Sequence, residues 1–173
     1  MGVLTATDNR WSVIDSHHNI LIRRRLEDVF RFVATDFFDN YPRWSPEVCE
    51  LEKLTAGEMA VGVKARQVRL DAGYRSEALF RVTQFERGHI LRFTSLSKPR
   101  FEVCYRFDRV DIDTRLSFDF RTELPLYLLP VRGYLEKIIR QGGRRVVTNL
   151  KMLLEAEAEA AMEKQLGGSA GRC

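Results

Sequence analysis

Apolar and polar residues alternate with a period of two through most of the chain between Val48 and Thr122. Six alternating segments follow one another there, and short turn sequences such as DAG at 71–73 and ERG at 86–88 separate some of them. Successive residues of a strand point to opposite faces of a sheet, and tight turns join antiparallel neighbours. The pattern therefore predicts six hairpin-linked strands in one antiparallel sheet, preceded by a strand over residues 12–22.

The alternation gives this sheet one aromatic face and one charged face. One set of positions holds Ala78, Phe80, Val82, Leu91, Phe93, Phe101, Val103, Tyr105, Phe107, Leu116, Phe118 and Phe120, in register with Tyr74, Ser76 and Thr114. The opposite set holds Arg75, Glu77, Arg81, Arg92, Glu102, Arg106, Arg115, Asp119 and Arg121. An aromatic face of this size needs a large apolar partner.

Helical periodicity appears on both sides of the six strands. Before them, an apolar stripe at i, i+3, i+4 and i+7 predicts a short helix, and its members are Leu26, Val29, Phe30 and Val33. We expect Pro42 and Pro46 to end helical structure soon afterwards. After the strands, roughly residues 131–165 predict a long amphipathic helix with the apolar sector Leu135, Ile138, Ile139, Gly142, Val146, Leu150 and Leu153. This helix is the candidate partner of the aromatic face.

Two adjacent glycines, Gly142 and Gly143, lie inside the predicted long helix. Glycine in a helix interior costs about 1 kcal/mol relative to alanine. The pair therefore indicates a local benefit, which is either a close approach of the backbone to a neighbour or room for a ligand.

The chain of 173 residues, 45% hydrophobic and 30% charged, has the composition of a single globular domain. Its 28 basic and 24 acidic residues give a net charge of +4, and no nucleic-acid-binding motif accompanies this small excess. We therefore expect no nucleic-acid partner. A basic stripe on the long helix, Lys137, Arg140, Arg144 and Lys151, is either a solvated face or a weak contact for an acidic membrane surface.

The cysteines and the N-terminal sequence indicate the compartment. Cys49, Cys104 and Cys173 are odd in number and widely spaced, which predicts free thiols in a reducing environment. The first residues lack the basic and apolar regions of a signal peptide, and the chain lacks a run of about 18 apolar residues. We expect a cytoplasmic protein.

No residue spacing indicates a metal or cofactor. His17 and His18 are neighbours on a predicted strand and so point to opposite faces, and no acidic residue spacing completes a ligand set with either. No serine or cysteine spacing indicates a nucleophilic triad either. We expect no metal and no cofactor, and no catalytic residue is assigned.

The order of elements resembles the helix-grip fold of the START-like (SRPBCC) superfamily, which includes the polyketide cyclase/dehydrase and lipid-transport families. The segment ILIRRRLEDVFRFVATDFFDNYPRWSPEV at 20–48 is similar to the family's entry pattern of a strand, a helix with Val-Phe, an Asp and a Trp-centred loop. Gly62, YRFDRVDIDTRL at 105–116 and NLKMLLE at 149–155 support it. The resemblance spans about residues 12–160.

This resemblance implies an α+β domain. In it, a curved seven-stranded antiparallel sheet wraps around the long C-terminal helix, with two short helices after strand one. The START-like ligand-binding domain would cover 12–160, between tails at 1–11 and 161–173. The resemblance also implies an internal cavity for an apolar ligand. The cavity candidates are Trp44, Tyr74, Ser76, Phe80, Phe93, Val103, Tyr105, Phe118 and Gly142.

Three groups of residues carry open alternatives. Trp44 and its aromatic neighbours either line the cavity mouth or seal the end of the sheet. The hydroxyls of Tyr74, Ser76 and Tyr105 either orient a ligand or bond a backbone carbonyl. Arg66 and Arg69 lie on opposite faces of their strand, so one of them either reaches inward to an anionic head group or both are solvated.

Three functions fit this domain. The first is binding, with or without transport, of a hydrophobic or amphipathic small molecule such as a lipid, isoprenoid or aromatic polyketide. The second is a polyketide aromatase/cyclase or dehydratase that uses cavity hydroxyls, and the third is a protein-interaction or assembly factor. An enzyme needs an inward ionisable group with a perturbed pKa, whereas the aromatic face supplies hydroxyls, which favours binding.

Overall fold

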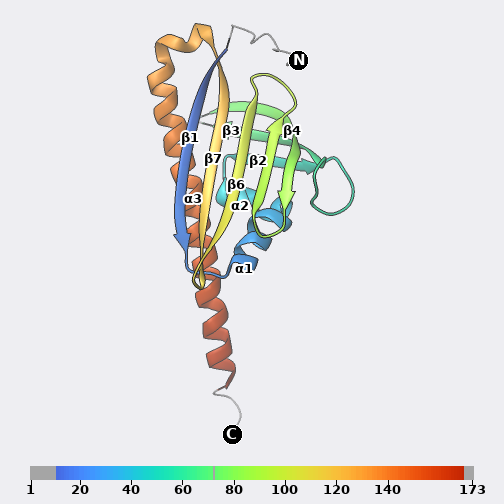
Figure 1. The fold of residues 1–173 in the computed structure, drawn as a ribbon, viewed down its shortest axis with the longest axis vertical. Helices are drawn as coiled ribbons and strands as arrows, with labels where there is room; N and C mark the ends of the chain where they lie inside the picture. Colours follow the sequence, from blue (N-terminus) through green and yellow to red (C-terminus); the bar gives the residue numbers. More distant parts are fainter. Residues whose placement is uncertain (1–10, 72, 170–173) are drawn as a thin grey trace, which may run out of the picture.

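The computed structural model describes residues 11–71 and 73–169, and Figure 1 shows their arrangement. Within these residues, seven strands form one antiparallel sheet in the order β1-β7-β6-β5-β4-β3-β2. The strands are β1 (Trp11–Ile22), β2 (Val48–Lys53), β3 (Lys64–Asp71), β4 (Tyr74–Glu86), β5 (Ile90–Ser95), β6 (Phe101–Val110) and β7 (Asp113–Pro125). The predicted hairpin-linked series is confirmed, and β1 joins its end by pairing with β7.

Helices occupy the two places where the sequence has helical periodicity. They are α1 (Leu26–Phe30), a π-helical turn η1 (Arg31–Thr35), α2 (Phe37–Trp44), a 3₁₀ turn η2 (Leu126–Val131) and α3 (Arg132–Ser169). The predicted α+β helix-grip fold is confirmed. α3 continues through 161–169, so that part of the predicted C-terminal tail is helical. The rest of both predicted tails, 1–10 and 170–173, lies outside the described residues.

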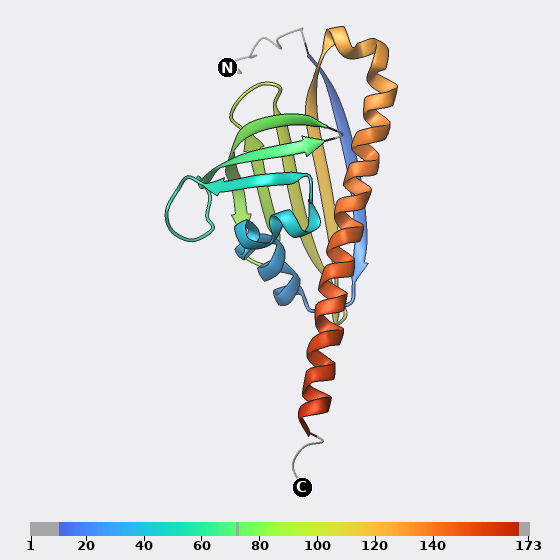
Figure 2. The same cartoon turned by 180° about the vertical axis from the view of Figure 1, so that it is seen from behind.

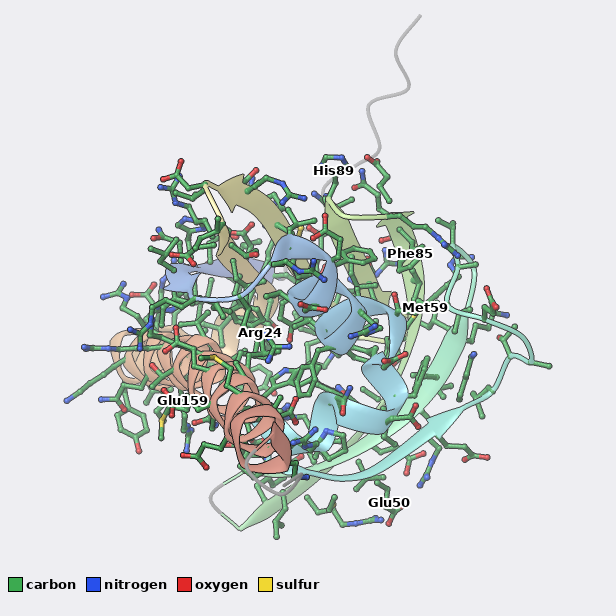
Figure 3. All side chains as sticks on the ribbon, turned by 90° about the horizontal axis from the view of Figure 1, so that it is seen from below. Arg24, Glu50, Met59, Phe85, His89 and Glu159 are labelled. Carbon is green, nitrogen blue, oxygen red and sulfur yellow. The ribbon has the colours of Figure 1, made fainter. Side chains whose placement is uncertain are left out.

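The sheet curves around the short helices, and α3 runs along its concave side (Figure 2). Irregular pairing contributes to the curvature, because the register shifts between Val82 and Gln84 on β4 and between Val48 and Glu50 on β2. Seen from below, α1 and α2 lie inside the curve and α3 closes its remaining side (Figure 3). Arg24, which Figure 3 labels, joins the two helical layers by donating to the Leu154 carbonyl at 2.8 Å.

The core consists of the predicted aromatic face and the residues that cover it. Phe80, Phe93 and Phe107 are at most 1% exposed. Phe37 on α2 packs edge-on against Phe93, with ring centroids 5.4 Å apart, and Phe30 on α1 packs edge-on against Phe107 at 5.1 Å. The short helices therefore cover the part of the aromatic face formed by Phe80 of β4, Phe93 of β5 and Phe107 of β6, and α3 packs on β1 and β7.

Helical structure ends just before Pro46, as expected, but Pro42 does not itself interrupt the helix. Pro42 lies inside α2, which continues to Trp44. A proline lacks only its own N–H, and it clashes with the preceding turn rather than with the following one. Two further helical residues are therefore compatible with Pro42, and Ser45 then leaves the helical conformation just before Pro46.

The two adjacent glycines of α3 have different surroundings. A Cβ on Gly143 would lie 2.6 Å from His18 Cδ2 and 3.2 Å from Ser16 Oγ, both on β1. A Cβ on Gly142 would meet nothing within 4 Å. Gly143 therefore allows α3 to lie directly on β1, while Gly142 faces open space. The sheet-facing residues of α3 continue as Val147, Leu150 and Leu154, all at most 3% exposed.

The remaining expectations concern thiols and membranes. Cys49 is exposed and Cys104 is buried, and neither is in a disulfide, while Cys173 lies outside the described residues. Among the helices in the described ranges, none combines the length and the apolar character needed to cross a membrane.

The glycine pair provides a matched test of helix packing. Gly142→Ala should raise the free energy of unfolding by about 0.5–1 kcal/mol, because it adds helix propensity without a clash. Gly143→Ala gains the same propensity but must displace His18, so it should be less stable than Gly142→Ala by about 1–3 kcal/mol. Urea denaturation of both variants measures the difference, and equal stabilities would contradict the close approach of α3 to β1.

Candidate functional site

A cavity of about 420 Å³ lies between the inner face of the sheet, the end of α2 and the first half of α3. Its walls come from β3, β4, β6 and β7, from residues 97–99, and from α3 between Ile138 and Val146. It exists because α3 packs on β1 through Gly143, at the edge of the sheet, and the short helices cover the other half of the inner face. The strip between these two contacts is left without a covering side chain.

The cavity wall is apolar on one side and polar on the other. The apolar side consists of Phe101, Val103, Phe118 and Phe120 from β6 and β7 with Ile138, Ile139 and Val146 from α3. The polar side consists of Ser45, Glu47, Gln67, Arg69, Asp71, Ser76 and Glu77, which lie at the end of α2, on β3 and on β4. This separation suits a ligand with an apolar body and a polar end.

The structure divides the predicted cavity residues into two groups. Trp44, Ser76, Val103, Tyr105, Phe118 and Gly142 border the cavity. Phe80 and Phe93 do not, because α2 covers their part of the sheet and they pack around Phe37 in the core. Tyr74 is 75% exposed, because it is the first residue of β4 and lies at the hairpin end, beyond the covering helices. These three predicted residues therefore lie away from this cavity, and ligand contact by any predicted residue stays a prediction.

Trp44 both seals the fold and borders the cavity. Its side chain is 0% exposed and contacts the rings of Phe32, Phe37 and Tyr41. Its Nε1 donates a hydrogen bond to the Tyr105 hydroxyl at 3.3 Å, and its carbonyl accepts one from Asn149 of α3 at 3.0 Å. Trp44 therefore occupies a position that fits both alternatives, because it closes the end of the sheet and also borders the cavity. Contact of Trp44 with a ligand stays a prediction.

Two buried tyrosines border the cavity, Tyr41 from α2 and Tyr105 from β6. Burial raises the pKa of Tyr105 well above its ordinary value of 10, and the neighbouring Tyr41 raises it further. Burial also raises the pKa of Tyr41, although Arg69 and Ser45 oppose this effect. Both phenols are therefore protonated at neutral pH. Because the Tyr105 oxygen accepts the Trp44 N–H, its own proton is available for donation to a ligand oxygen.

Arg69 is the arginine of β3 that reaches inward. It donates to both carboxylate oxygens of Asp71 at 3.1 Å and to Ser45 Oγ at 3.2 Å. Burial lowers the pKa of Arg69, but Tyr41 and Asp71 outweigh burial and raise it, so the guanidinium stays charged. Arg66 points outward instead and pairs with Glu77 and Glu50.

Ion pairs and hydrogen bonds join α3 to the end of α2 beside the cavity. Arg145 of α3 pairs with Glu47 at 3.2 Å, and both residues line the cavity wall. Arg43 of α2 pairs with Glu157 at 2.6 Å. Exposed ion pairs contribute little to stability, about 0–1 kcal/mol each.

Sequence reasoning missed several residues of the cavity wall. Phe101 and Phe120 share the strand parity of Val103 and Phe118, so the alternation contained the signal for them. Gln67 also occupies an inward position, between Ala65 and Arg69 on β3, and a glutamine on an apolar face was an available signal. Ile138, Ile139 and Val146 belong to the predicted apolar sector of α3, but only the structure shows which part of that sector faces the cavity.

The two adjacent histidines lie outside this cavity. His17 points outward and hydrogen-bonds Asp119 through Nδ1, and His18 faces inward and bonds Ser16 through Nε2 at 2.8 Å. His18 lines a separate depression of about 430 Å³ beside Lys137, Arg140 and Arg144 of α3. Burial lowers its pKa, and the neighbouring His17, Arg140 and Arg144 lower it further. In the described part of the chain, no cluster of three metal-ligating side chains occurs.

Residues 14–155 match the sequence model of a family described as "Polyketide cyclase / dehydrase and lipid transport". No curated protein matches the sequence significantly. Similar solved structures exist at low sequence identity, and they support the fold alone.

One similar structure is the Zhui aromatase/cyclase from Streptomyces sp. R1128, with a TM-score of 0.73, 16% identity, and coverage of 87% of this chain and 98% of that chain. A START superfamily protein from Mycobacterium smegmatis has a TM-score of 0.69 at 15% identity, covering 82% and 97%. The di-domain aromatase/cyclase StfQ from the steffimycin biosynthetic pathway has 0.69 at 14%, covering 85% and 52%.

The raised pKa of Tyr105 makes a prediction about alkaline unfolding. The folded protein holds the phenolic proton above the ordinary pKa of 10, whereas the unfolded chain releases it. This stabilisation is fully present below pH ~10 and is lost as the pH rises through the folded-state pKa. Tyr105→Phe removes the effect, so its free energy of unfolding should fall less than that of wild type between pH ~9 and pH ~11.5.

At neutral pH the same variant should be less stable by about 1–3 kcal/mol, because Trp44 Nε1 loses its acceptor. Urea titrations at both pH values measure the two effects. The control is Tyr74→Phe, which removes an exposed hydroxyl and should follow wild type. An equal alkaline loss in Tyr105→Phe and wild type would contradict the assignment.

Proposed function

Because the chain belongs to the polyketide cyclase/dehydrase and lipid transport family, we propose that it binds a hydrophobic or amphipathic small molecule in the cavity beside α3. A lipid, an isoprenoid or an aromatic polyketide has the required character, and transport of such a molecule is an extension of the same binding. The single observation that carries the proposal is the two-sided cavity, apolar toward β6, β7 and α3 and polar toward β3.

The cavity is a costly feature for a purely structural domain. Protein cores are normally packed without large voids, and each void loses contacts and stability. Its volume of about 420 Å³ falls within the usual range of ligand pockets, about 300–1,000 Å³. Phe101, Phe118 and Phe120 line it with rings that a bound apolar body would cover. A ligand therefore supplies the contacts that the protein itself omits.

A second candidate function is cyclisation or dehydration of a polyketide, and two observations favour it. Two of the similar structures carry the name aromatase/cyclase. Tyr105 and Arg69 also place a protonated phenol and a guanidinium at the cavity, where such donors polarise a carbonyl oxygen. A base is harder to assign, because the cavity carboxylates of Glu47, Asp71 and Glu77 each pair with an arginine. We therefore place binding first.

The interaction-factor alternative has less support. It expects a closed core with an exposed apolar patch, whereas the inner face of this sheet borders a cavity. Contact of the basic face of α3 with an acidic membrane surface stays a separate prediction.

Two leucine substitutions in α3, one at Gly142 and one at Gly133, test the proposal with a matched control. Gly142→Leu places a side chain in the open space of the cavity, while Gly133→Leu places the same side chain at the start of the same helix, outside it. Both variants gain helix propensity. We expect wild type and Gly133→Leu, purified from the native host, to retain a small molecule in native mass spectrometry, and Gly142→Leu to lose most of it.

Extraction then identifies the retained molecule. Recovery of two forms of this molecule that differ by the mass of one water would favour the dehydratase or cyclase function. Absence of any bound molecule from wild type, together with no thermal shift from a panel of lipids and aromatic polyketides, would refute the binding function. Equal retention by the two leucine variants would place the ligand elsewhere.

A further inference from the structure

Gln67 is a buried polar side chain on the cavity wall. It lies at an inward position of β3, is 4% exposed and borders the cavity. Its Oε1 is buried and has no hydrogen-bond partner among the described residues.

Folding alone gives no reason for a glutamine at this position. An unsatisfied buried amide loses its hydration without compensation, and an apolar side chain of similar size would avoid that loss. The neighbours of Gln67 on the same face of β3 include Ala65, which is 0% exposed, so an apolar residue would fit the pattern. A group that enters the cavity and bonds the amide would remove the cost.

The charged groups of the cavity wall already have partners. Arg69 is bidentate to Asp71, and Arg145 pairs with Glu47. Glu77 pairs with Arg66, and Lys98 lies over the ring of Trp11 at 4.8 Å. An anionic or cationic group on a ligand would have to break one of these contacts to be neutralised. The wall therefore favours a ligand whose polar end is uncharged.

We propose that Gln67 is the recognition residue of the cavity and selects a neutral ligand that carries a hydroxyl and a carbonyl group on an apolar body. The hydroxyl donates to Oε1 of Gln67, and a carbonyl accepts from its Nε2 or from the Tyr105 hydroxyl. The apolar body lies against Phe101 and Phe118. The inference rests on the proposed binding function and names its ligand class.

Three coumarins form the probe set for isothermal titration calorimetry with the full chain. 6-Hydroxycoumarin and coumarin differ by one hydroxyl, and coumarin-3-carboxylate adds a negative charge. Wild type should bind 6-hydroxycoumarin tighter than coumarin by roughly 2- to 12-fold, the range expected for one neutral hydrogen bond. It should bind coumarin-3-carboxylate weakest of the three.

Gln67→Leu should bind 6-hydroxycoumarin and coumarin equally, because it has no amide to accept the hydroxyl proton. Its melting temperature should equal or exceed that of wild type, since the substitution removes an unsatisfied polar group. A merely structural glutamine predicts a lower melting temperature instead. Gln84→Leu is the matched control: Gln84 lies on β4 outside the cavity and bonds Glu86 at 2.7 Å. This control should keep the selectivity of wild type.

Each contrary result has a distinct meaning. Equal affinity of wild type for 6-hydroxycoumarin and coumarin, or unchanged selectivity in Gln67→Leu, overturns the role of Gln67 and leaves the binding function intact. Preference for coumarin-3-carboxylate overturns the selection of neutral ligands. Failure of wild type to bind any of the three overturns this inference, while the proposed function is decided separately by the molecule retained in native mass spectrometry.

Discussion

The rest of the site depends on the close contact of α3 with β1. Gly143 lets the helix backbone lie against His18 and Ser16, and this places α3 at one edge of the inner face instead of over its centre. The short helices are fixed on the other half of that face by Phe30 and Phe37. Because α3 and the short helices are held at opposite sides of the inner face, part of β6 and β7 between them is left uncovered. This uncovered part forms the apolar wall of the cavity.

The cavity then inherits two chemistries from the strands that border it. β6 and β7 supply phenylalanines, while β3 supplies Gln67 and Arg69 from its inward positions. Arg69 is neutralised by Asp71 inside the wall, so its charge mainly organises its neighbours, Ser45 and Tyr41. Among the described residues that line the cavity, Gln67 carries the buried side-chain oxygen that has no hydrogen-bond partner. Recognition through a neutral hydrogen bond, with the charges held as fixed pairs, follows from this division.

The sequence predicted the sheet and its faces well because a period of two is a strong signal in strands joined by tight turns. Phe80 and Phe93 show the limit of that signal: parity correctly placed them inside, but only tertiary packing decides that α2, and not a cavity, covers them. Tyr74 shows a second limit, since parity continues to the end of a strand after its cover has ended. Pro42 shows a third, because a short helix tolerates a proline two residues before its end.

The glycine pair shows why the site needed the structure. The energetic cost of two glycines in a helix indicated a local benefit, but that cost is the same whether the benefit is a close contact or an open space. In the structure, Gly143 makes the close contact and Gly142 borders the open space. Glycines 100° apart on a helix face different neighbours. Gly143 fixes α3 on β1, and Gly142 keeps the wall beside it open. Stability given up at Gly142 and at Gln67 has the same explanation, because both residues leave unfilled contacts that a ligand can complete.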